Sequence, residues 1–171
     1  MTSKFISAFV AAFVVTTAAL RAATVPPNVQ MAIAADYQLG CTAALDPSDA
    51  NLAAAFAFLS PDYVDTDIKG QKYTREQSVA QGTQGMKSLH TTVCEPTLVS
   101  STLNGDRTIT AVEQVHLIGT VQANSGTHDL DVTVKAQDTW KQLNGTWIQT
   151  SSQELRNLVK MDGNVVQDEG Q

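Results

Sequence analysis

The sequence has few basic residues, few histidines and few cysteines. Lys and Arg number 11 against 17 Asp and Glu, with 3 His and 2 Cys among 171 residues. A chain this acidic does not offer the basic surface that nucleic-acid binding requires. It also contains no GxGxxG, no Walker phosphate loop, no HExxH and no CxxC, so the enzyme classes that depend on these motifs lose their support.

Metal and nucleophilic chemistry have little support either. His90, His116 and His128 show no metal-ligand spacing, so we expect no metal site and no cofactor. The serines are many and unmarked, and no Ser-His-Asp or Cys-His arrangement can be argued from the sequence. Nucleophilic catalysis is therefore unsupported.

Long apolar runs are missing as well, with one exception at the N-terminus. Lys4 precedes an uncharged apolar stretch at residues 5–20, and small residues follow it, which is the layout of a secretory signal peptide. The alternative is an uncleaved membrane anchor, but the stretch is shorter than the ~20 residues that span a bilayer. We expect cleavage after Ala19 or Ala22, a secreted or periplasmic protein, and no stable membrane insertion afterwards.

Removal of residues 1–22 would leave a chain long enough for one domain with a real core. We expect a short linker at 23–28, one domain at 29–159 and a loose, polar, acidic tail at 160–171. Taking Lys4 and Arg21 from the 11 basic residues leaves 9 against 17 acidic ones. That balance favours solubility and says little about the substrate.

The two cysteines, Cys41 and Cys94, are predicted to form a disulfide, because an even number of cysteines in an oxidising compartment favours pairing. The alternative is that both are simply buried thiols. The bridge would be structural, and the loop it closes corresponds to roughly 4 kcal/mol of chain entropy.

Apolar spacing predicts two helices in the first third of the chain. A stripe with a period of four runs down the first helix. Its members are Val29, Ile33, Tyr37, Cys41 and Leu45. A second, short helix is expected to begin at Asp46-Pro47, with Asp as N-cap and Pro at the first position, and to end near Ser60-Pro61.

Residues 62–70 alternate in polarity and predict a short strand. In this interpretation Val64 and Ile68 face the core, whereas Asp65 and Asp67 point to solvent or to the mouth of a pocket. Thr74 and Gln77 form a capping box that opens a third helix. Gly82 and Gly85 are expected to make that helix short or frayed.

From His90 onward, β-branched residues dominate, with turn signals at 104–106, 124–126 and 144–145. They predict four long antiparallel strands in a meander. On the third strand, alternation places Asp138 on the same face as Ala136 and Trp140, a face that should line a pocket. A carboxyl buried there would have a raised pKa.

This order of elements resembles the NTF2-like superfamily, which includes SnoaL-like and DUF4440-like domains. The most similar segments are FLSPDYVDTDIKGQKYTREQ and QDTWKQLNGTWIQTSSQEL, and the resemblance spans roughly residues 29–158. It implies an α+β fold, a cone in which a curved antiparallel sheet wraps N-terminal helices around an open pocket.

The resemblance also implies candidate site residues. Ketosteroid isomerases of this superfamily use an aspartate base, a tyrosine donor and a protonated aspartic acid, and these roles fall on Asp67, Tyr37 and Asp138. Tyr37 lies about a turn and a half earlier than the family tyrosine. The alternatives are a solvated acidic strand for Asp67 and a structural hydrogen bond for Asp138.

The leading functional hypothesis is an exported domain that binds a small, largely apolar molecule in its cone, as a homodimer through the outer face of the sheet. Tyr63, Trp140 and His116 are the candidate ligand-binding residues. Whether the protein is an enzyme stays open. The alternatives are a cofactor-independent isomerase, cyclase or dehydratase, and a non-catalytic association module.

Overall fold

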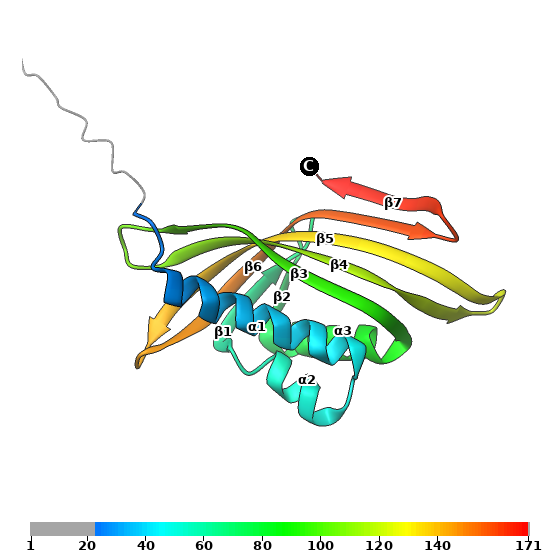
Figure 1. Cartoon of the computed structure of the whole chain (residues 1–171), viewed down its shortest axis with the longest axis horizontal. Helices are drawn as coiled ribbons and strands as arrows, with labels where there is room; N and C mark the ends of the chain where they lie inside the picture. The colour runs from blue at the N-terminus through cyan, green and yellow to red at the C-terminus, as the bar shows by residue number, and fades with distance from the viewer. Residues whose placement is uncertain (1–22, 171) are drawn as a thin grey trace, which may run out of the picture.

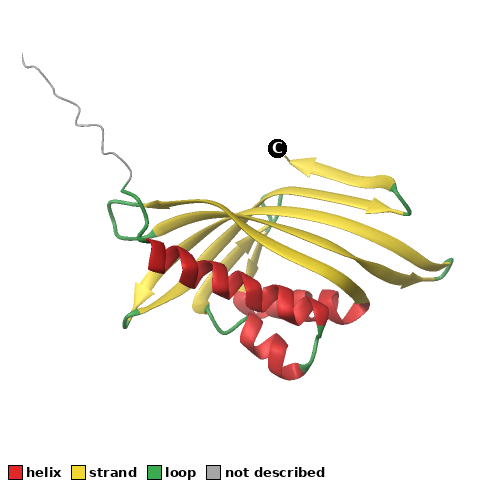
Figure 2. Ribbon diagram, viewed as in Figure 1, coloured by secondary structure: helices red, strands yellow, loops and turns green. Residues whose placement is uncertain are grey.

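The computed structural model describes residues 23–170, so the segment predicted to be a signal peptide lies outside the described residues. Three helices lie on one side of a seven-stranded sheet (Figures 1 and 2). The helices are α1 (Pro27–Leu45), α2 (Asp49–Ala55) and α3 (Arg75–Ser88). The strands are β1 (Leu59–Thr66), β2 (Lys72–Thr74), β3 (Leu89–Leu103), β4 (Ile109–Ala123), β5 (Gly126–Leu143), β6 (Thr146–Met161) and β7 (Asn164–Gly170).

The predicted α+β architecture and its C-terminal meander are confirmed. Strands β3, β4, β5 and β6 pair antiparallel in sequence order, and the turns between them fall where the sequence signals lie. Asn144 and Gly145 both have positive φ, 51° and 86°, as a tight hairpin turn requires. The sheet order is β2-β1-β6-β5-β4-β3, and only β1 runs parallel to its neighbour β6.

The long strands bend around the helices instead of lying flat. The β3–β4 ladder shifts register between Thr91 and Val93, and such bulges bend a strand. Gly119 lies opposite, where a Cβ would come within 2.5 Å of the His90 carbonyl oxygen. Glycine therefore permits the close strand approach at the bend. The concave face that results carries the site described below.

The C-terminal segment differs from the expected loose tail. Residues 164–170 form β7, which pairs with Arg156–Met161 of β6 after a turn at Asp162-Gly163. The pairing of β1 uses an earlier part of β6, residues 149–153. The two strands thus lie one after the other along the same edge of β6. The sequence offered no apolar alternation here because both faces of this edge strand are largely exposed.

The first two helices follow the apolar pattern with corrections at their ends. In α1, Ile33, Tyr37 and Cys41 are buried as predicted, but Leu45 at the C-terminal end is exposed. Helix α2 begins later than predicted, because Ser48 accepts the capping hydrogen bond from the Asn51 amide. It ends at Ala55, so Ser60-Pro61 belongs to β1.

The side chains of strand β1 point to the opposite faces of the sheet from those predicted. Tyr63 is buried and Val64 is 36% exposed, so Tyr63 and Asp65 point inward. The predicted assignment relied on Val64 and Ile68 as core residues, whereas the large buried side chain of this strand is the tyrosine. An inversion by one residue moves every side chain of a strand to the other face. An acidic residue, Asp65, is thereby placed inside.

Helix α3 opens with the predicted Thr74–Gln77 capping box. It is neither short nor frayed, because it continues for 14 residues through both glycines. Gly82 has a packing reason, since a Cβ there would lie 2.9 Å from the Phe56 ring. None of the described helices is long and apolar enough to cross a membrane.

The main core lies between the N-terminal half of α1 and the sheet. Trp140 is fully buried at its centre, stacked on Phe58 at 5.5 Å and meeting Tyr37 edge-on at 5.7 Å. Ile33 and Ile109 close the cluster. A second, smaller cluster joins α1 to α2. The C-terminal half of α1 leaves more room against the sheet, and a cavity occupies it.

Candidate ligand-binding and acid–base site

A cavity of about 360 Å³ lies between α1, α3 and the concave face of the sheet. Its wall is mostly apolar, with side chains from α1, α3, β3 and β4. The apolar lining includes Ala44, Phe58, Met86, Leu89, Val115 and Leu117. Five polar or acidic residues interrupt it: Asp36, Tyr37, Thr91, Glu113 and Gln149. An apolar wall with few polar groups is typical of small-molecule sites.

Glycines on the facing helices leave part of this space open. Gly40 of α1 and Gly85 of α3 both line the cavity, and a Cβ at either position would contact nothing within 4 Å. Any larger residue would therefore project into free space at these positions. Two glycines that cost helix stability are thus located where they enlarge the cavity.

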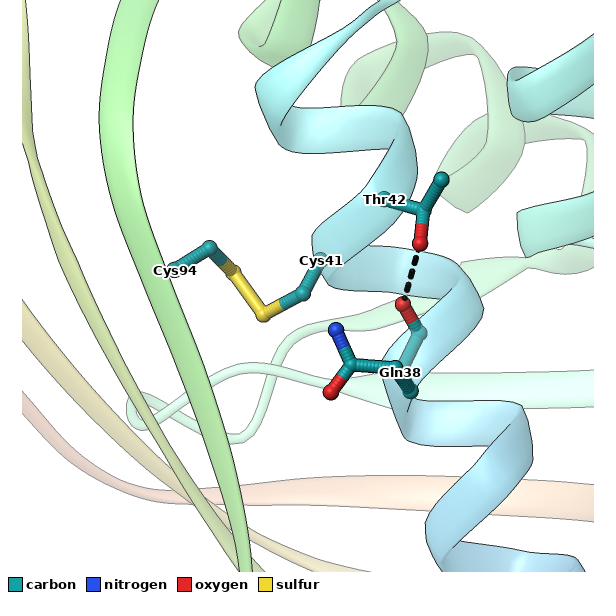
Figure 3. The surroundings of a disulfide bond; sticks show 4 residues. All are labelled: Gln38, Cys41, Thr42 and Cys94. Atoms are coloured by element: carbon teal, nitrogen blue, oxygen red, sulfur yellow. Dashed lines mark hydrogen bonds between the residues drawn. A yellow bond between two sulfur atoms is a disulfide. The ribbon is translucent and has the colours of Figure 1, made fainter.

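The predicted disulfide is present and forms part of the cavity wall. Cys41 of α1 and Cys94 of β3 are joined, with their Cα atoms 5.3 Å apart, and both line the cavity (Figure 3). The bridge fixes α1 against the sheet close to the polar groups of the site. It therefore limits how far the cavity can open on this side.

The structure brings together two of the three residues proposed for acid–base chemistry. The Tyr37 hydroxyl donates a hydrogen bond of 2.6 Å to Asp138 Oδ2, joining α1 to β5. The Trp140 indole NH donates to the same hydroxyl at 3.3 Å. Tyr37 lines the cavity, whereas Asp138 lies behind it with no exposed surface. The earlier position of Tyr37 on the helix does not prevent the pairing.

Burial dominates the electrostatics of this pair. It raises the pKa of Asp138 to about 6, against the opposing effect of the Tyr37 hydrogen bond. Burial and the charges of Asp138 and Glu113 raise the pKa of Tyr37, so the phenol keeps its proton. Ser152 and Gln149 lie close enough to lower the pKa of Asp138 as well, but neither makes a hydrogen bond of good geometry to its Oδ1, which has no other partner among the described residues. Asp138 is thus a buried acid with one oxygen, Oδ2, hydrogen-bonded to Tyr37 and the other, Oδ1, without such a bond.

Glu113 of β4 is one of two acids that line the cavity, with Asp36 of α1. Its Oε2 is buried and has no hydrogen-bond partner in the described part of the chain. Burial, followed by the charge of Asp138, raises the pKa of Glu113 to about 8. A carboxyl in this environment is largely protonated at neutral pH. It can exchange a proton with a molecule in the cavity.

Strand register explains why Glu113 and Asp138 influence each other. Asp138 lies opposite Ala111 on β4, and Glu113 lies opposite Ala136 on β5, so the two acids are diagonal neighbours on one face. Small alanine side chains occupy the other two corners. Two carboxyls so placed resist double ionisation, which favours retention of a proton by the pair.

Glu113 was missed by the sequence analysis, although a signal was present. Residues 109, 111, 115 and 117 form an inward-facing apolar series on β4, and Glu113 interrupts this series at its middle. A charged residue in the buried phase of a strand is unusual unless it is paired or functional. The same alternation that marks Asp138 on β5 also marks Glu113 on β4.

Two residues of β1 extend the acidic group beneath the cavity. Asp65 lies opposite Ser152 in the β1–β6 ladder, and Ser152 in turn lies opposite Asp138. Burial raises the pKa of Asp65, and burial together with Asp65 and Asp138 raises the pKa of Tyr63. Tyr63 therefore lies beside this group as a protonated phenol, and it is not among the cavity-lining residues.

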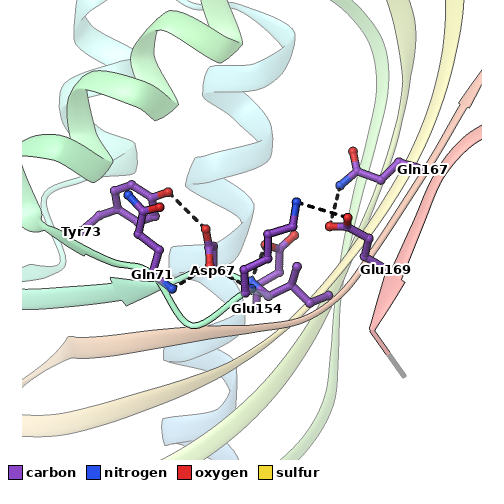
Figure 4. Close-up of polar contacts among 8 residues, drawn as sticks. Asp67, Gln71, Tyr73, Glu154, Gln167 and Glu169 are labelled. Atoms are coloured by element: carbon purple, nitrogen blue, oxygen red, sulfur yellow. Dashed lines mark hydrogen bonds and ion pairs between the residues drawn. The ribbon is translucent and has the colours of Figure 1, made fainter.

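Asp67, the proposed base, lies elsewhere, in the turn between β1 and β2 (Figure 4). Its Oδ1 accepts hydrogen bonds from the amides of Lys69 and Gln71, both at 2.9 Å, and its Oδ2 accepts one from the Tyr73 hydroxyl at 3.1 Å. These bonds lower the pKa of Asp67. The structure does not bring it together with Tyr37 and Asp138. Its geometry is that of a turn residue.

The proposed binding residues Trp140 and His116 also lie away from the cavity wall. Trp140 is enclosed in the core, where its NH supports the Tyr37 hydroxyl. His116 alternates with the cavity-lining Val115 and Leu117, so it faces the outer side of the sheet. There its Nε2 lies 3.0 Å from Asp131 Oδ1.

A Ser-His-Asp chain, not expected from the sequence, connects two hairpin ends. Ser125 Oγ lies 2.6 Å from His128 Nε2, and His128 Nδ1 lies 2.7 Å from Asp162 Oδ2. The other Asp162 oxygen accepts the Asp129 amide at 2.9 Å. Neither Ser125 nor His128 lines the cavity. The chain joins the β4–β5 turn to the β6–β7 turn and is interpreted as a structural clip.

Metal binding finds no geometric basis in the described residues. Within residues 23–170, no group of three or more His, Cys, Asp or Glu side chains is arranged to hold a metal ion.

No protein-family model matches the sequence, and no curated protein is significantly similar to it. Solved structures do match the fold. An NTF2-like protein from Cytophaga hutchinsonii is 17% identical, with a TM-score of 0.55 over 73% of this chain and 95% of the other.

Two further solved structures extend the comparison. A hexachlorocyclohexane dehydrochlorinase is 12% identical, with a TM-score of 0.64 over 78% of this chain and 88% of the other. A candidate scytalone dehydratase from Novosphingobium aromaticivorans is 12% identical, with a TM-score of 0.61 over 84% and 93%. At these identities the likeness establishes the fold, and the fold is NTF2-like.

Proposed function

We propose that this NTF2-like domain binds a small, largely apolar molecule in the cavity between α1, α3 and the sheet. The observation that carries the proposal is the cavity of about 360 Å³, whose largely apolar wall includes Glu113, a carboxyl with one buried oxygen, Oε2, that has no partner among the described residues. Small-molecule sites have volumes of roughly 300–1,000 Å³ and combine apolar walls with a few orienting polar groups. Glu113 would supply the orienting group.

Filling the cavity tests this function directly. The variant Gly40→Leu adds a side chain where a Cβ meets nothing within 4 Å, at a position that lines the cavity. Ala35→Leu adds the same side chain at an exposed position of α1 and is the matched control. Native mass spectrometry of protein from its own host should detect a retained small molecule with wild type and Ala35→Leu, and none with Gly40→Leu. Equal retention by all three would contradict the proposal.

We also propose that the protein is exported to the periplasm or the medium. The Cys41–Cys94 disulfide supports this location, because disulfides persist in oxidising compartments. The expected evidence is a processed N-terminus between Ala19 and Ala23 in protein recovered from the exported fraction. The same native mass spectra would report the oligomeric state and so test the predicted homodimer. An unprocessed chain that stays with the cytoplasmic fraction would contradict export.

A second candidate function is acid–base catalysis on the bound molecule. The observation in its favour is the raised pKa of Glu113, about 8, beside the Tyr37–Asp138 pair. In its carboxylate form Glu113 would accept a proton from carbon, and in its acid form it would return one, while the Tyr37–Asp138 pair keeps the raised pKa of Glu113 in place. The dehydrochlorinase and candidate dehydratase with this fold are consistent with such chemistry.

Proton exchange with solvent separates catalysis from simple binding. In D₂O, wild-type protein should speed deuterium incorporation next to the carbonyl of a small cyclic ketone, measured by NMR, and Glu113→Gln should not. Tyr73→Phe, which changes only a surface turn, should behave as wild type. If wild type exchanges the ketone no faster than buffer, a binding function without catalysis is favoured.

A further inference from the structure

The polar groups around the cavity have a strong bias in charge and in hydrogen-bonding capacity. Two of the five polar lining residues, Asp36 and Glu113, are acids, and no Lys, Arg or His is found among the cavity-lining residues described. Asp138 lies directly behind the wall. An anionic ligand would meet this group without any compensating cation.

Apart from the proton that Glu113 itself carries in the free protein, hydrogen-bond donors are also scarce at the wall. The Tyr37 hydroxyl proton is committed to Asp138 Oδ2, so towards a ligand Tyr37 can only accept. Glu113 Oε2 is buried without a donor. Thr91 and Gln149 can each donate or accept, and they are the remaining neutral polar groups. A ligand that supplies donors would therefore satisfy the wall better than one that supplies acceptors.

From these observations we propose that the natural ligand is an apolar amine, a cation whose ammonium group pairs with Glu113 while its hydrocarbon part contacts the wall. The proposal rests on the proposed binding function and names its ligand class. An ammonium group carries three N–H donors and a positive charge, which match an unpaired acid oxygen among acceptors. Phe58, Met86 and Leu117 offer the apolar contacts.

The proton balance of this binding step is defined. In the free protein, burial keeps Glu113 largely protonated at neutral pH. When R–NH₃⁺ binds, Glu113 becomes a carboxylate in an ion pair, and its proton goes to solvent. One proton is released for each amine bound, so affinity should increase as pH rises towards about 8, the pKa of free Glu113.

The titratable groups around Glu113 are carboxyls and phenols. Helix α1 presents Asp36 and Tyr37, β5 presents Asp138, and β1 contributes Asp65 to the field at Asp138. Lining residues from α3, β3 and β6 do not titrate, and Cys94 is held in the disulfide. All the titratable neighbours are acids or phenols, so each favours a cationic ligand.

Calorimetry with three probes of similar shape tests the inference: 2-phenylethylamine, 2-phenylethanol and 3-phenylpropanoate. The amine should bind wild type at least about tenfold more tightly than the alcohol, which corresponds to one charge-assisted interaction. Titration in buffers of different ionisation enthalpy should show release of about one proton at pH 7. Glu113→Gln should weaken amine binding by about tenfold or more.

The outcomes distinguish failure of the inference from failure of the binding function. Alcohol or carboxylate binding as tight as that of the amine, or no proton release, overturns the amine assignment while a cavity function stands. Binding that persists unchanged in Gly40→Leu places the amine outside the cavity and overturns it as well. Proton release and pH dependence are measured on wild type, so the test holds even if Glu113→Gln fails to fold.

Discussion

Two Tyr–Asp hydrogen bonds in this molecule use the same chemical groups in opposite environments. Tyr37 donates to Asp138 at 2.6 Å inside the fold, and Tyr73 donates to Asp67 at 3.1 Å in a surface turn. The pKa of Asp138 is raised, whereas the pKa of Asp67 is lowered. Burial dominates in the first pair, and two backbone amides stabilise the carboxylate in the second.

The difference shows which acids in this fold can take part in chemistry. Asp67 has both oxygens satisfied by local donors, which makes it a good turn residue and a poor proton acceptor. Asp138 and Glu113 each retain a buried oxygen without a partner. Unsatisfied buried polar groups reduce stability, so they tend to persist where they serve a function. The interior Tyr37–Asp138 pair, with Glu113 beside it, is therefore the candidate site, and the Tyr73–Asp67 pair in the turn is the natural control.

The largest expected effect comes from cutting the covalent link that holds the interior pair in place. Replacing both cysteines, Cys41→Ser with Cys94→Ser, removes a bridge across a sequence separation of 53. The free energy of unfolding should fall by about 4 kcal/mol in urea denaturation, because the unfolded chain gains the entropy of an open loop. The surface pair, held by local contacts, should keep its hydrogen bonds. A loss below about 1 kcal/mol would contradict a stabilising role for the bridge.

The second prediction concerns the pH dependence of stability. The pKa of Glu113 is raised in the fold from 4.5 to about 8, so stability should decrease as pH rises through that interval. The slope should reach up to about 1.4 kcal/mol per pH unit. Glu113→Gln, which cannot ionise, should flatten this part of the profile in thermal or urea unfolding. A wild-type stability that is level from pH 5 to pH 8 would contradict the raised pKa.

The third prediction compares the two tyrosines. Tyr37→Phe leaves Asp138 without its donor inside the protein and should cost about 1–3 kcal/mol of unfolding free energy. The pKa of Asp138 should rise further, because the lost hydrogen bond had lowered it. Tyr73→Phe is the matched control and should cost distinctly less. Equal losses by chemical denaturation would remove the contrast between interior and surface.

The smallest effect is expected at Asp67. Its pKa is lowered in the fold, so it contributes stability above its ordinary value of 3.8 that is lost as pH falls through the lowered value. Asp67→Asn should therefore lower stability slightly above pH 5, where the carboxylate contributes, and should match wild type at the lowest pH, so that the variant is less sensitive to acid. This is opposite in sign to the Glu113 effect. The measurement is thermal unfolding between pH 2 and pH 5.

Much of the fold could be predicted because its signals are local. Asn-Gly turns require positive φ, the Thr74–Gln77 box caps a helix, and a period of four marks α1, so the meander and the helices followed. The facing of β1 could not be fixed in the same way. A short strand with Tyr63, Val64 and Asp65 in succession offers no unique choice of buried face until its neighbours are known.

The site was predictable in part for a related reason. Asp138 was found because it stands among apolar residues in the buried phase of β5, and Tyr37 because it belongs to the stripe of α1. Asp67 was taken from a positional match to other proteins, and the turn geometry places it elsewhere. Glu113 could have been found in the same way as Asp138, because it interrupts the inward-facing apolar residues of β4. Internal evidence from burial was thus more informative here than alignment by position.

The position of β7 along β6 has a consequence for how the molecule avoids association. Without it, the backbone of residues 156–161 would lack a neighbour on the side where β7 now pairs. Such open edges invite strands of other molecules to add on, and charged edge strands resist this. Asp168 pairs with Arg156, and Glu169 with Lys69, so the final strand carries charge where the sheet ends. The acidic residues of segment 164–170, which led us to expect a loose tail, are the kind of residues that protect an edge strand from pairing with other molecules.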